Sequence, residues 1–366
     1  MKGCGVSPRL AIVLGTRPEM IKLAPIIRAM RDRVLVVHTG QHFDANMSGF
    51  FLDQLHIGQP DLLLEVGGAT RGSQIGQSLI AIEQFLITEK PAAVLVQGDT
   101  NSALAGGLAA NAASIPLAHL EAGLRSYDRT MPEEHNRILL DAVSDMCLAP
   151  HRSNYDILRQ EGISESRIRV TGSTLRTALE DLLPDLAERN DLLLQHQIER
   201  DQFVLATVHR VENADSEANL RSILTELASL SVPVILPLHP RTRKRAAEFG
   251  LTDLLDQLRV TDPLGYREFI SLAADCALII SDSGGVQEEA TIVKRPVIVV
   301  RSSTERPEIV GTFAHLMPVG SPIGQKAQEI LNNRSEVHQH LSSLPYPYGQ
   351  DATEQCVAAL DELLNV

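Results

Sequence analysis

The fold class is decided by residues 10–19, which read LAIVLGTRPE. The apolar run Leu10–Leu14 predicts a strand, and the amphipathic stretch after the motif predicts a helix. Between them, Gly15 permits a tight turn and Pro18 suits the first position of a helix. A strand that leads through a short turn into a helix is the unit from which parallel α/β sheets are built.

This unit recurs along the chain, because short β-branched runs alternate with longer amphipathic stretches. The first half contains six such runs: Leu10–Leu14, Val34–His38, Ala92–Val96, Ile115–His119, Met146–Ala149 and Ile168–Thr171. The second half also contains six: Phe203–Thr207, Val232–Pro237, Leu258–Thr261, Cys276–Ser281, Pro296–Val300 and His315–Val319. The pattern predicts an α/β protein of two doubly wound, Rossmann-like domains.

The boundary between the domains is expected near Thr174. The stretch Leu175–Asp201 is rich in Leu, Glu, Gln and Arg and predicts a helical connection. We assign residues 1–174 to an N-terminal domain and 175–352 to a C-terminal domain. A last helix, Thr353–Leu364, can pack on either half, and we place it with the first. Ligands of such sheets bind beyond the carboxyl ends of the strands, so the active site is expected in the interdomain cleft.

The composition excludes several classes of protein. In 366 residues, 44% of them hydrophobic, no stretch approaches the about 18 uninterrupted apolar residues of a membrane span. A formal net charge of -13 argues against a broad nucleic-acid-binding surface. Residues 1–10 contain no long apolar run, so no secretory signal is expected. The cysteines Cys4, Cys147, Cys276 and Cys356 form no CxxC pair, which fits a reducing cytoplasm.

Polar residues gather where the strands of the first half end. Arg17 and Lys22, near the start of a helix, can grip a phosphate or carboxylate, although a capped helix with two solvated cations explains them as well. His42, Asp99 and Glu121 follow the second, third and fourth strands. Because these strand ends share one edge of the sheet, we expect a polar rim there.

A further segment of the first half, Met131–Arg137, opens another helix with Glu133 in its first turn. Acidic residues in a first turn offset the helix dipole, and Glu133 can also pair with Arg137. These structural interpretations account for the segment completely, so its residue pattern alone does not indicate a function.

The second half contains a ligand-binding motif, Ser281–Glu289, after an apolar strand. Gly284 and Gly285 let the backbone approach a ligand, and the next helix offers N–H groups to a diphosphate. Glu288 and Glu289 follow, where a carboxylate can accept ribose hydroxyl protons. The motif is neither a Walker loop nor GxGxxG, so ATP and NAD are poorly supported. No HExxH motif or cysteine cluster occurs, so no metal is expected.

Several motifs occur in an order that resembles a known family. They are Gly15–Glu19, Gln97–Thr100, Glu121–Gly123, Pro132–Glu134, His209–Arg210, Asp282–Gly285 and Thr304–Pro307. The ensemble is similar to the non-hydrolysing UDP-N-acetylglucosamine 2-epimerases, from Arg9 to about Leu364. The resemblance implies a glycosyltransferase B architecture, a homodimer, and an isomerase that acts on a UDP-amino sugar without a cofactor.

The resemblance also implies roles for individual residues. It places Asp99, Glu121 and Glu133 around C2 of the sugar, and it counts His209, which would also hold the diphosphate, among the catalytic residues. The remaining positions would bind the substrate: Arg17, Lys22, His42, Arg137, Phe269 (through its backbone, to uracil), Ser283, Gly284, Gly285, Glu289 and Arg306.

Two features are typical of one branch of this family. Val208 stands where many regulated bacterial members have glycine, and Arg125–Met131 resembles archaeal members and epimerases of modified UDP-sugars. We therefore expect hyperbolic kinetics without activation by a second substrate molecule. The substrate is expected to be UDP-GlcNAc or a modified UDP-sugar such as a diacetamido uronate.

The mechanism that the resemblance implies begins with loss of UDP and of the C2 proton, which gives a 2-acetamidoglucal. UDP then returns to C1 while a proton reaches the opposite face of C2. Three alternatives stay open: a hydrolysing epimerase, a UDP-sugar glycosyltransferase, and a nucleotide-sugar-binding regulator without turnover. The three carboxylates favour the epimerase, because simple transfer would not require them.

Overall fold

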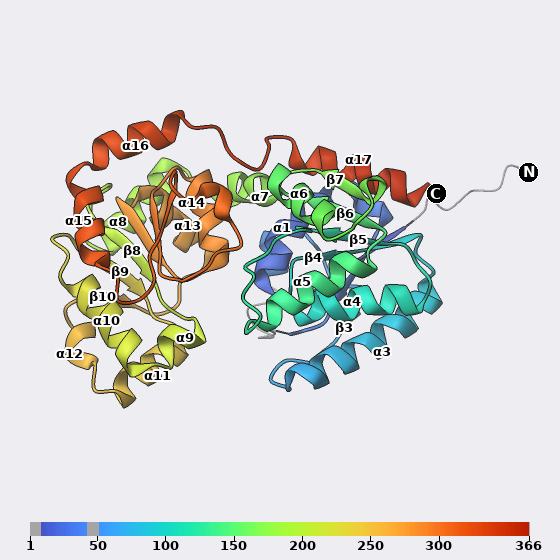
Figure 1. Cartoon of the computed structure of the whole chain (residues 1–366), viewed down its shortest axis with the longest axis horizontal. Coiled ribbons are helices and arrows are strands. Elements are labelled where there is room, and N and C mark those ends of the chain that lie inside the picture. Colours follow the sequence, from blue (N-terminus) through green and yellow to red (C-terminus); the bar gives the residue numbers. More distant parts are fainter. Residues whose placement is uncertain (1–8, 42–50, 366) are drawn as a thin grey trace, which may run out of the picture. The chain divides into compact units, whose positions relative to one another are not determined.

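The computed structural model describes residues 9–41 and 51–365, and the chain divides into two compact units (Figure 1). The first unit contains the residues up to Ala178 together with those from Tyr348 onward. The second unit is Leu179–Pro347. Each unit has its own parallel sheet, with helices alternating with strands, so the α/β prediction is confirmed.

Within the described residues, the first sheet has seven parallel strands in the order β3-β2-β1-β4-β5-β6-β7. Their bounds are β1 (Leu10–Leu14), β2 (Val34–His38), β3 (Leu62–Leu63), β4 (Ala93–Gln97), β5 (Leu117–Leu120), β6 (Met146–Ala149) and β7 (Ile168–Val170). Strand β1 is central, because Leu10 pairs with Val34 on one side and with Ala93 on the other. We had not predicted β3, because a run of two residues shows no periodicity.

Helices cover this sheet and bury its apolar side chains. They are α1 (Arg17–Met30), α3 (Arg71–Glu89), α4 (Asn101–Ala112), α5 (Pro132–Val143), α6 (Arg152–Gln160), α7 (Leu175–Leu182) and α17 (Ala352–Leu364), with the 3₁₀ turns η1 (Arg31–Arg33) and η2 (Glu165–Arg167). Helix α1 begins at Arg17, so Pro18 takes the second helical position and not the first. Helix α17 packs against α1, and its Glu362 pairs with Arg169 at 2.9 Å.

The second sheet has six parallel strands among the described residues, in the order β10-β9-β8-β11-β12-β13. They are β8 (Val204–Thr207), β9 (Val234–Pro237), β10 (Arg259–Thr261), β11 (Leu278–Ser281), β12 (Val297–Val299) and β13 (Ala314–Leu316). All six overlap the runs that the sequence predicts.

The second unit is likewise covered by helices. They are α8 (Leu186–Gln195), α9 (Val211–Ala214), α10 (Glu217–Ala228), α11 (Pro240–Glu248), α12 (Thr252–Leu255), α13 (Tyr266–Asp275), α14 (Gly284–Ile292), α15 (Ile323–Asn332) and α16 (Arg334–Ser343), with the 3₁₀ turn η3 (Pro307–Ile309). Strand residues such as Ile280 pack with helix residues such as Leu224 and Ala327 in one core. Among the described residues, no helix has both the length and the hydropathy needed to cross a membrane.

The strand order predicts which edge of each sheet would bind a ligand. In the first sheet the order changes direction between β1 and β4, and in the second between β8 and β11. Ligands of doubly wound sheets bind beyond the carboxyl ends of the strands at such a switch point. The residues after these four strands are therefore the first place to look for a site in each unit.

Candidate functional site

The turn between β1 and α1 lies at the switch point of the first unit and is tightly packed. A Cβ atom on Gly15 would lie 2.1 Å from the hydroxyl oxygens of Thr39 and Ser102. Those two hydroxyls are hydrogen-bonded to each other at 2.6 Å. Close packing between the strand ends therefore requires glycine at position 15. The sequence argument had given only the tight turn as the reason.

Glu121, after β5, lies at the centre of a buried polar cluster. Its carboxylate lies 2.5 Å from Lys22 Nζ and accepts a hydrogen bond from the Gln97 side chain. Both charged side chains are at most 10% exposed. The backbone of Glu121 has φ +69°, a conformation that non-glycine residues seldom adopt and that clusters at functional sites.

Asp99 lies beside this cluster, in the turn after β4. Its carboxylate pairs with Arg137 of α5, and its carbonyl oxygen accepts a hydrogen bond from Asn136 Nδ2 at 2.7 Å. A Cβ atom on the preceding Gly98 would lie 3.7 Å from the Glu121 carboxylate. The structure therefore brings Asp99, Glu121 and Arg137 to one edge of the sheet.

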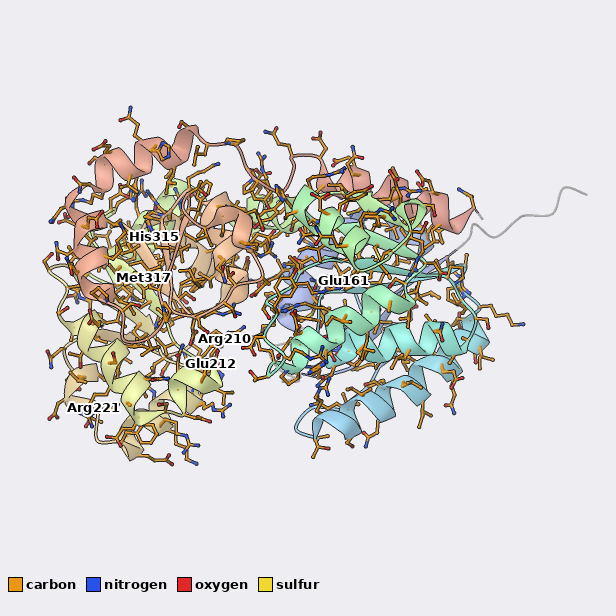
Figure 2. All side chains as sticks on the ribbon, viewed as in Figure 1. Glu161, Arg210, Glu212, Arg221, His315 and Met317 are labelled. Carbon is orange, nitrogen blue, oxygen red and sulfur yellow. The ribbon has the colours of Figure 1, made fainter. Side chains whose placement is uncertain are left out.

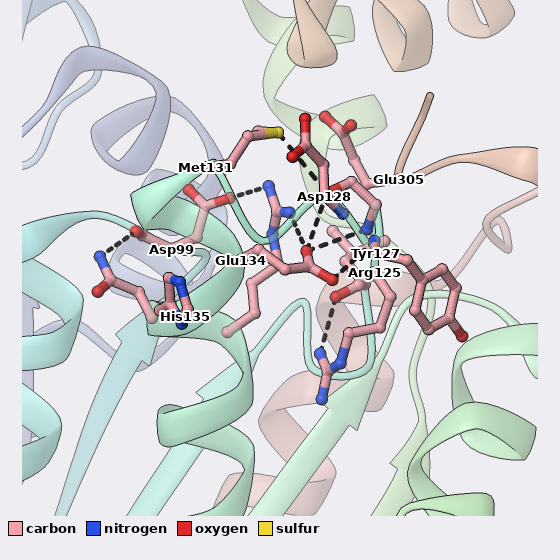
Figure 3. Close-up of polar contacts among 12 residues, drawn as sticks. Asp99, Arg125, Tyr127, Asp128, Met131, Glu134, His135 and Glu305 are labelled. Carbon is pink, nitrogen blue, oxygen red and sulfur yellow. Dashed lines mark hydrogen bonds and ion pairs between the residues drawn. The ribbon is translucent and has the colours of Figure 1, made fainter. Parts of the chain in front are cut away.

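Glu134, which the sequence had not singled out, is a buried carboxylate of α5 (Figure 3). It accepts hydrogen bonds from the backbone N–H groups of Ser126 (3.0 Å) and Tyr127 (2.8 Å) and from Arg137 Nη1 (2.7 Å). Burial raises the pKa of Glu134, but these hydrogen bonds and the charge of Arg137 outweigh burial, so its pKa is lowered. Glu133 is exposed, and Arg137 forms its helix ion pair with Glu134, three residues away.

A second buried network lies beside Gly98. His119 Nδ1 lies 2.7 Å from Asp141, and its Nε2 lies 2.8 Å from the Gly98 carbonyl oxygen. Arg125 pairs with Asp141 at 2.7 Å and with Glu161 (labelled in Figure 2) at 2.6 Å. Burial raises the pKa of Asp141, but His119 and Arg125 outweigh burial and lower it. The network holds the turn that carries Asp99.

Two further predicted binding residues of the first unit are Arg17 and His42. Arg17 is exposed at the start of α1, with its guanidinium carbon 6.0 Å from the centre of the Phe51 ring. His42 lies outside the described residues.

In the second unit, Asp282 holds the ends of β8 and β11 together. Its buried carboxylate accepts hydrogen bonds from the backbone N–H groups of His209 (3.1 Å) and Arg210 (3.0 Å) and pairs with His209 Nδ1 at 3.0 Å. Burial raises the pKa of Asp282, but the contacts with His209 and its other donors outweigh burial and lower it. The His209 side chain stays 45% exposed, so its ring can reach a ligand. Arg210 pairs with Glu212 of α9 at 3.3 Å (Figure 2).

The residues Ser283–Gly285 form the start of α14, where the Ser283 hydroxyl does not cap the helix. A Cβ atom on Gly284 would lie 2.0 Å from Glu305 Oε1. A side chain at 284 would therefore displace the Glu305 carboxylate from its contact with Arg301, a packing reason for glycine beside the ligand that the sequence argument invoked. At Gly285, a Cβ atom would meet nothing closer than Ser283 Oγ at 4.0 Å.

Residues of the loop after β12 contact α14. Arg306 is 2% exposed, and its Nη2 lies 2.6 Å from the fully buried Glu288. Thr304 donates a hydrogen bond to Gln287 at 2.6 Å. Arg306, predicted to hold the substrate, thus contacts the helix that carries the glycine motif.

Glu289 and Phe269 lie on neighbouring helices. The Tyr266 hydroxyl donates to Glu289 at 3.0 Å, and burial together with the Glu289 charge raises the pKa of Tyr266 well above its usual value. Tyr266 therefore stays a donor. Sequence reasoning missed it, although it lies three residues before Phe269. The backbone N–H of Phe269 already donates to the Gly265 carbonyl at 2.9 Å.

No metal centre is formed within the described part of the chain, where no group of three or more His, Cys, Asp or Glu side chains is arranged to hold an ion. Both switch points instead carry ion pairs and helix starts. This geometry suits an anionic organic ligand with sites for proton transfer.

Comparison with known proteins agrees with this geometry. The family model described as UDP-N-acetylglucosamine 2-epimerase matches residues 27–361. The chain belongs to the UDP-N-acetylglucosamine 2-epimerase family. The family predicted from the ordered motifs is confirmed, and with it the prediction that the chain is an isomerase.

Individual members of this family are similar over most of the chain. The UDP-N-acetylglucosamine 2-epimerase of Methanocaldococcus jannaschii is 43% identical over 89% of this chain and 93% of its own length. The UDP-2,3-diacetamido-2,3-dideoxy-D-glucuronate 2-epimerase of Pseudomonas aeruginosa is 41% identical, over 84% of this chain and 88% of its own. These two relatives are an archaeal epimerase and an epimerase of a modified sugar, the groups that Arg125–Met131 resembles.

A solved member of the epimerase family shares the fold. The crystal structure of the Methanocaldococcus jannaschii UDP-GlcNAc 2-epimerase in complex with UDP-GlcNAc and UDP matches with a TM-score of 0.83 and 38% identity. The match covers 97% of this chain and 99% of that one. The predicted fold class is therefore confirmed.

Proposed function

We propose that this protein inverts C2 of a UDP-N-acetyl amino sugar and interconverts UDP-GlcNAc and UDP-ManNAc. The proposal is carried by the pairing of two carboxylates with buried cations at one switch point, Glu121 with Lys22 and Asp99 with Arg137. A reaction in which one carbon loses and regains a proton needs acid and base groups of this kind. The ligands named for the solved relative, UDP-GlcNAc and UDP, support the substrate class.

The second unit would bind UDP. The start of α14 at Ser283–Gly285 favours a diphosphate, because helix N-termini attract anions. His209, held by Asp282, would donate to the same diphosphate. Glu289, held by Tyr266, would accept the ribose hydroxyl protons.

The nucleobase and the remaining cations complete this assignment. The backbone of Phe269 would read uracil through its carbonyl group or by sharing its N–H. Lys22 contacts Glu121, so we give it the role of holding that carboxylate ionised and in place. Arg306 would orient α14 through Glu288, and the exposed Arg17 would reach the phosphates.

The reaction would proceed by elimination and re-addition. The C1–O bond breaks and its electron pair leaves with UDP, while a carboxylate takes the C2 proton and the C1=C2 double bond of a 2-acetamidoglucal forms. UDP then adds back at C1, and C2 takes a proton on the opposite face. Two faces require two differently held groups, and Glu121 and Asp99 meet that requirement because each has its own cation. Glu133 would be a third group, at the exposed start of α5.

Incubation with UDP-GlcNAc in deuterated water, followed by proton NMR, tests this function. The proposal expects UDP-ManNAc that carries deuterium at C2. An oxygen-18 label between C1 and the phosphate should also scramble into non-bridging positions if UDP leaves. Free N-acetylmannosamine with UDP would indicate the hydrolysing alternative, and turnover that needs an added acceptor would indicate a transferase. Product without C2 deuterium would exclude the mechanism.

A modified UDP-sugar is the second candidate substrate, because of the 41% identity to the diacetamido-glucuronate epimerase. A competition assay with UDP-GlcNAc and UDP-2,3-diacetamido-2,3-dideoxy-glucuronate compares the two kcat/KM values directly. Hyperbolic kinetics, a homodimer and a cytoplasmic location stay predictions of the sequence.

A further inference from the structure

Glu19, the last residue of the first motif, is a buried carboxylate that forms the capping box of α1 with Thr16 and to which the proposed mechanism gives no role. It lies in the first turn of α1 and is 1% exposed. Within the described residues, no lysine, arginine or histidine is recorded as pairing with it. A buried carboxylate without a cation is costly unless hydrogen bonds satisfy it.

Four donors satisfy Glu19, and they come from two different turns. Its Oε2 accepts from the backbone N–H groups of Gly15 (3.0 Å) and Thr16 (2.8 Å) and from the Thr16 hydroxyl (2.8 Å). Its Oε1 accepts from the Thr100 hydroxyl at 2.7 Å. Only an ionised carboxylate accepts from all four groups, because the protonated acid would place a donor against a donor.

The contact with Thr100 joins Glu19 to the catalytic edge of the sheet. Thr100 is the N-cap of α4 and accepts a hydrogen bond from Ala103 N at 3.0 Å. It directly follows Asp99, the carboxylate paired with Arg137. Because the Thr100 hydroxyl donates to Glu19 and accepts from Ala103, its orientation is determined on both sides.

We propose, on the basis of the proposed function, that Glu19 is a positioning residue that links the turn carrying Arg17 to the turn carrying Asp99 through hydrogen bonds. Its carboxylate spans the ends of β1 and β4, the two strands of the switch point. Loss of the carboxylate frees both turns at once. The proton-transfer step then slows, while the nucleotide site of the second unit is unchanged.

Burial raises the pKa of Glu19 to about 7, against the lowering effect of its four hydrogen bonds. The groups that donate to it, Gly15, Thr16 and Thr100, are not titratable. Ionisation of Glu19 therefore contributes an acidic limb near pH 7 to the pH profile of kcat. The rate rises with pH as the carboxylate forms.

The test compares Glu19→Gln and Thr100→Val with Thr100→Ser, which keeps the hydroxyl. One or two hydrogen bonds to a charged group correspond to about a tenfold to hundredfold effect, so kcat should fall by that factor in Glu19→Gln and Thr100→Val. In Thr100→Ser it should stay within about threefold of wild type, since the bond is kept. UDP affinity by calorimetry should fall by much less than kcat, because Arg17 is the one phosphate contact that we place on the freed turns, and the acidic limb should disappear in Glu19→Gln.

Amide hydrogen exchange tests the same contacts without turnover. Exchange at Gly15 and Thr16 should accelerate by about tenfold or more in Glu19→Gln, because the neutral amide oxygen of glutamine is a weaker acceptor than the carboxylate. Wild-type kcat, pH profile and exchange in Glu19→Gln would overturn the proposal, as would loss of UDP affinity in parallel with kcat. A wild-type enzyme that does not exchange the C2 proton would remove the proposed function, while the amide exchange still reports on the two turns.

Discussion

The two switch points of this protein use the same topology for different chemistry. In the first unit, the edge at β1 and β4 carries carboxylates held by buried cations: Glu121 by Lys22 and Asp99 by Arg137. In the second unit, the edge at β8 and β11 carries a glycine-rich helix start, with Asp282 holding His209 beside it. Under the proposed function, one sheet edge would supply proton-transfer groups and the other an anion site, so the shared topology would set the place and the side chains the chemistry.

The largest expected effect separates chemistry from nucleotide binding. Asp99→Asn, Glu121→Gln and Glu133→Gln remove one carboxylate each at nearly constant size. At least two of them should lose about 10²-fold or more in kcat, the usual contribution of acid–base groups. UDP affinity, measured by calorimetry, should stay within about tenfold, or 1.4 kcal/mol.

The matched control for those variants is Glu89→Gln, which removes a partly exposed ion pair with Arg9 in the same unit. Its kcat should equal that of wild type. Amide variants of Asp99 and Glu121 that turn over normally would reduce both carboxylates to structural ion-pair partners and end the contrast between the two edges.

A smaller effect distinguishes packing from ligand binding at the second edge. Gly284→Ala places a Cβ 2.0 Å from Glu305 Oε1, so it should lower Tm and weaken UDP binding together. In Gly285→Ala the nearest atom to the new Cβ is Ser283 Oγ at 4.0 Å, so Tm should hold while UDP affinity falls. Calorimetry and thermal melts measure both. Unchanged UDP affinity in Gly285→Ala would place the diphosphate elsewhere.

The next effect concerns the pH dependence of stability in the first unit. Burial raises the folded-state pKa of Glu19 from 4.5 to about 7. Between these values the folded protein keeps a proton that the unfolded chain releases, so stability falls as pH rises through this window. Glu19→Gln should remove this fall, visible as a flatter plot of Tm against pH. Parallel plots for wild type and variant would contradict the shift.

The smallest expected effect is none at all. Neither edge gathers a metal-binding group among the described residues. Exhaustive EDTA treatment should therefore leave kcat unchanged. If EDTA lowers kcat and a specific divalent ion restores it, a metal ion takes part in the reaction and this prediction is wrong.

Strand positions, helix starts and the family could be predicted from sequence because each has a local signature. The runs Leu10–Leu14, Val34–His38 and Met146–Ala149 match the strands residue for residue. The family was identified from seven motifs between Gly15 and Pro307, since they occur in order. Strand β3 was not predicted, because a run of two residues is too short to show the two-residue alternation of a strand.

The partners of charged side chains could not be predicted, because they depend on which strands are neighbours. The sequence predicts Lys22 and Arg306 as ligand-binding cations, and only the structure shows that they also contact Glu121 and Glu288. Sequence spacing favoured Glu133 as the partner of Arg137, but burial selected Glu134.

The sequence by itself therefore determined the approximate positions of most strands and which kinds of group stand at their ends, because periodicity and turn chemistry act over a few residues. Only the tertiary structure decided that Glu19 joins the turns after β1 and β4 and that Gly284 makes room for Glu305. Those contacts link positions far apart in the chain. They follow from strand order and burial, which a local sequence pattern does not determine.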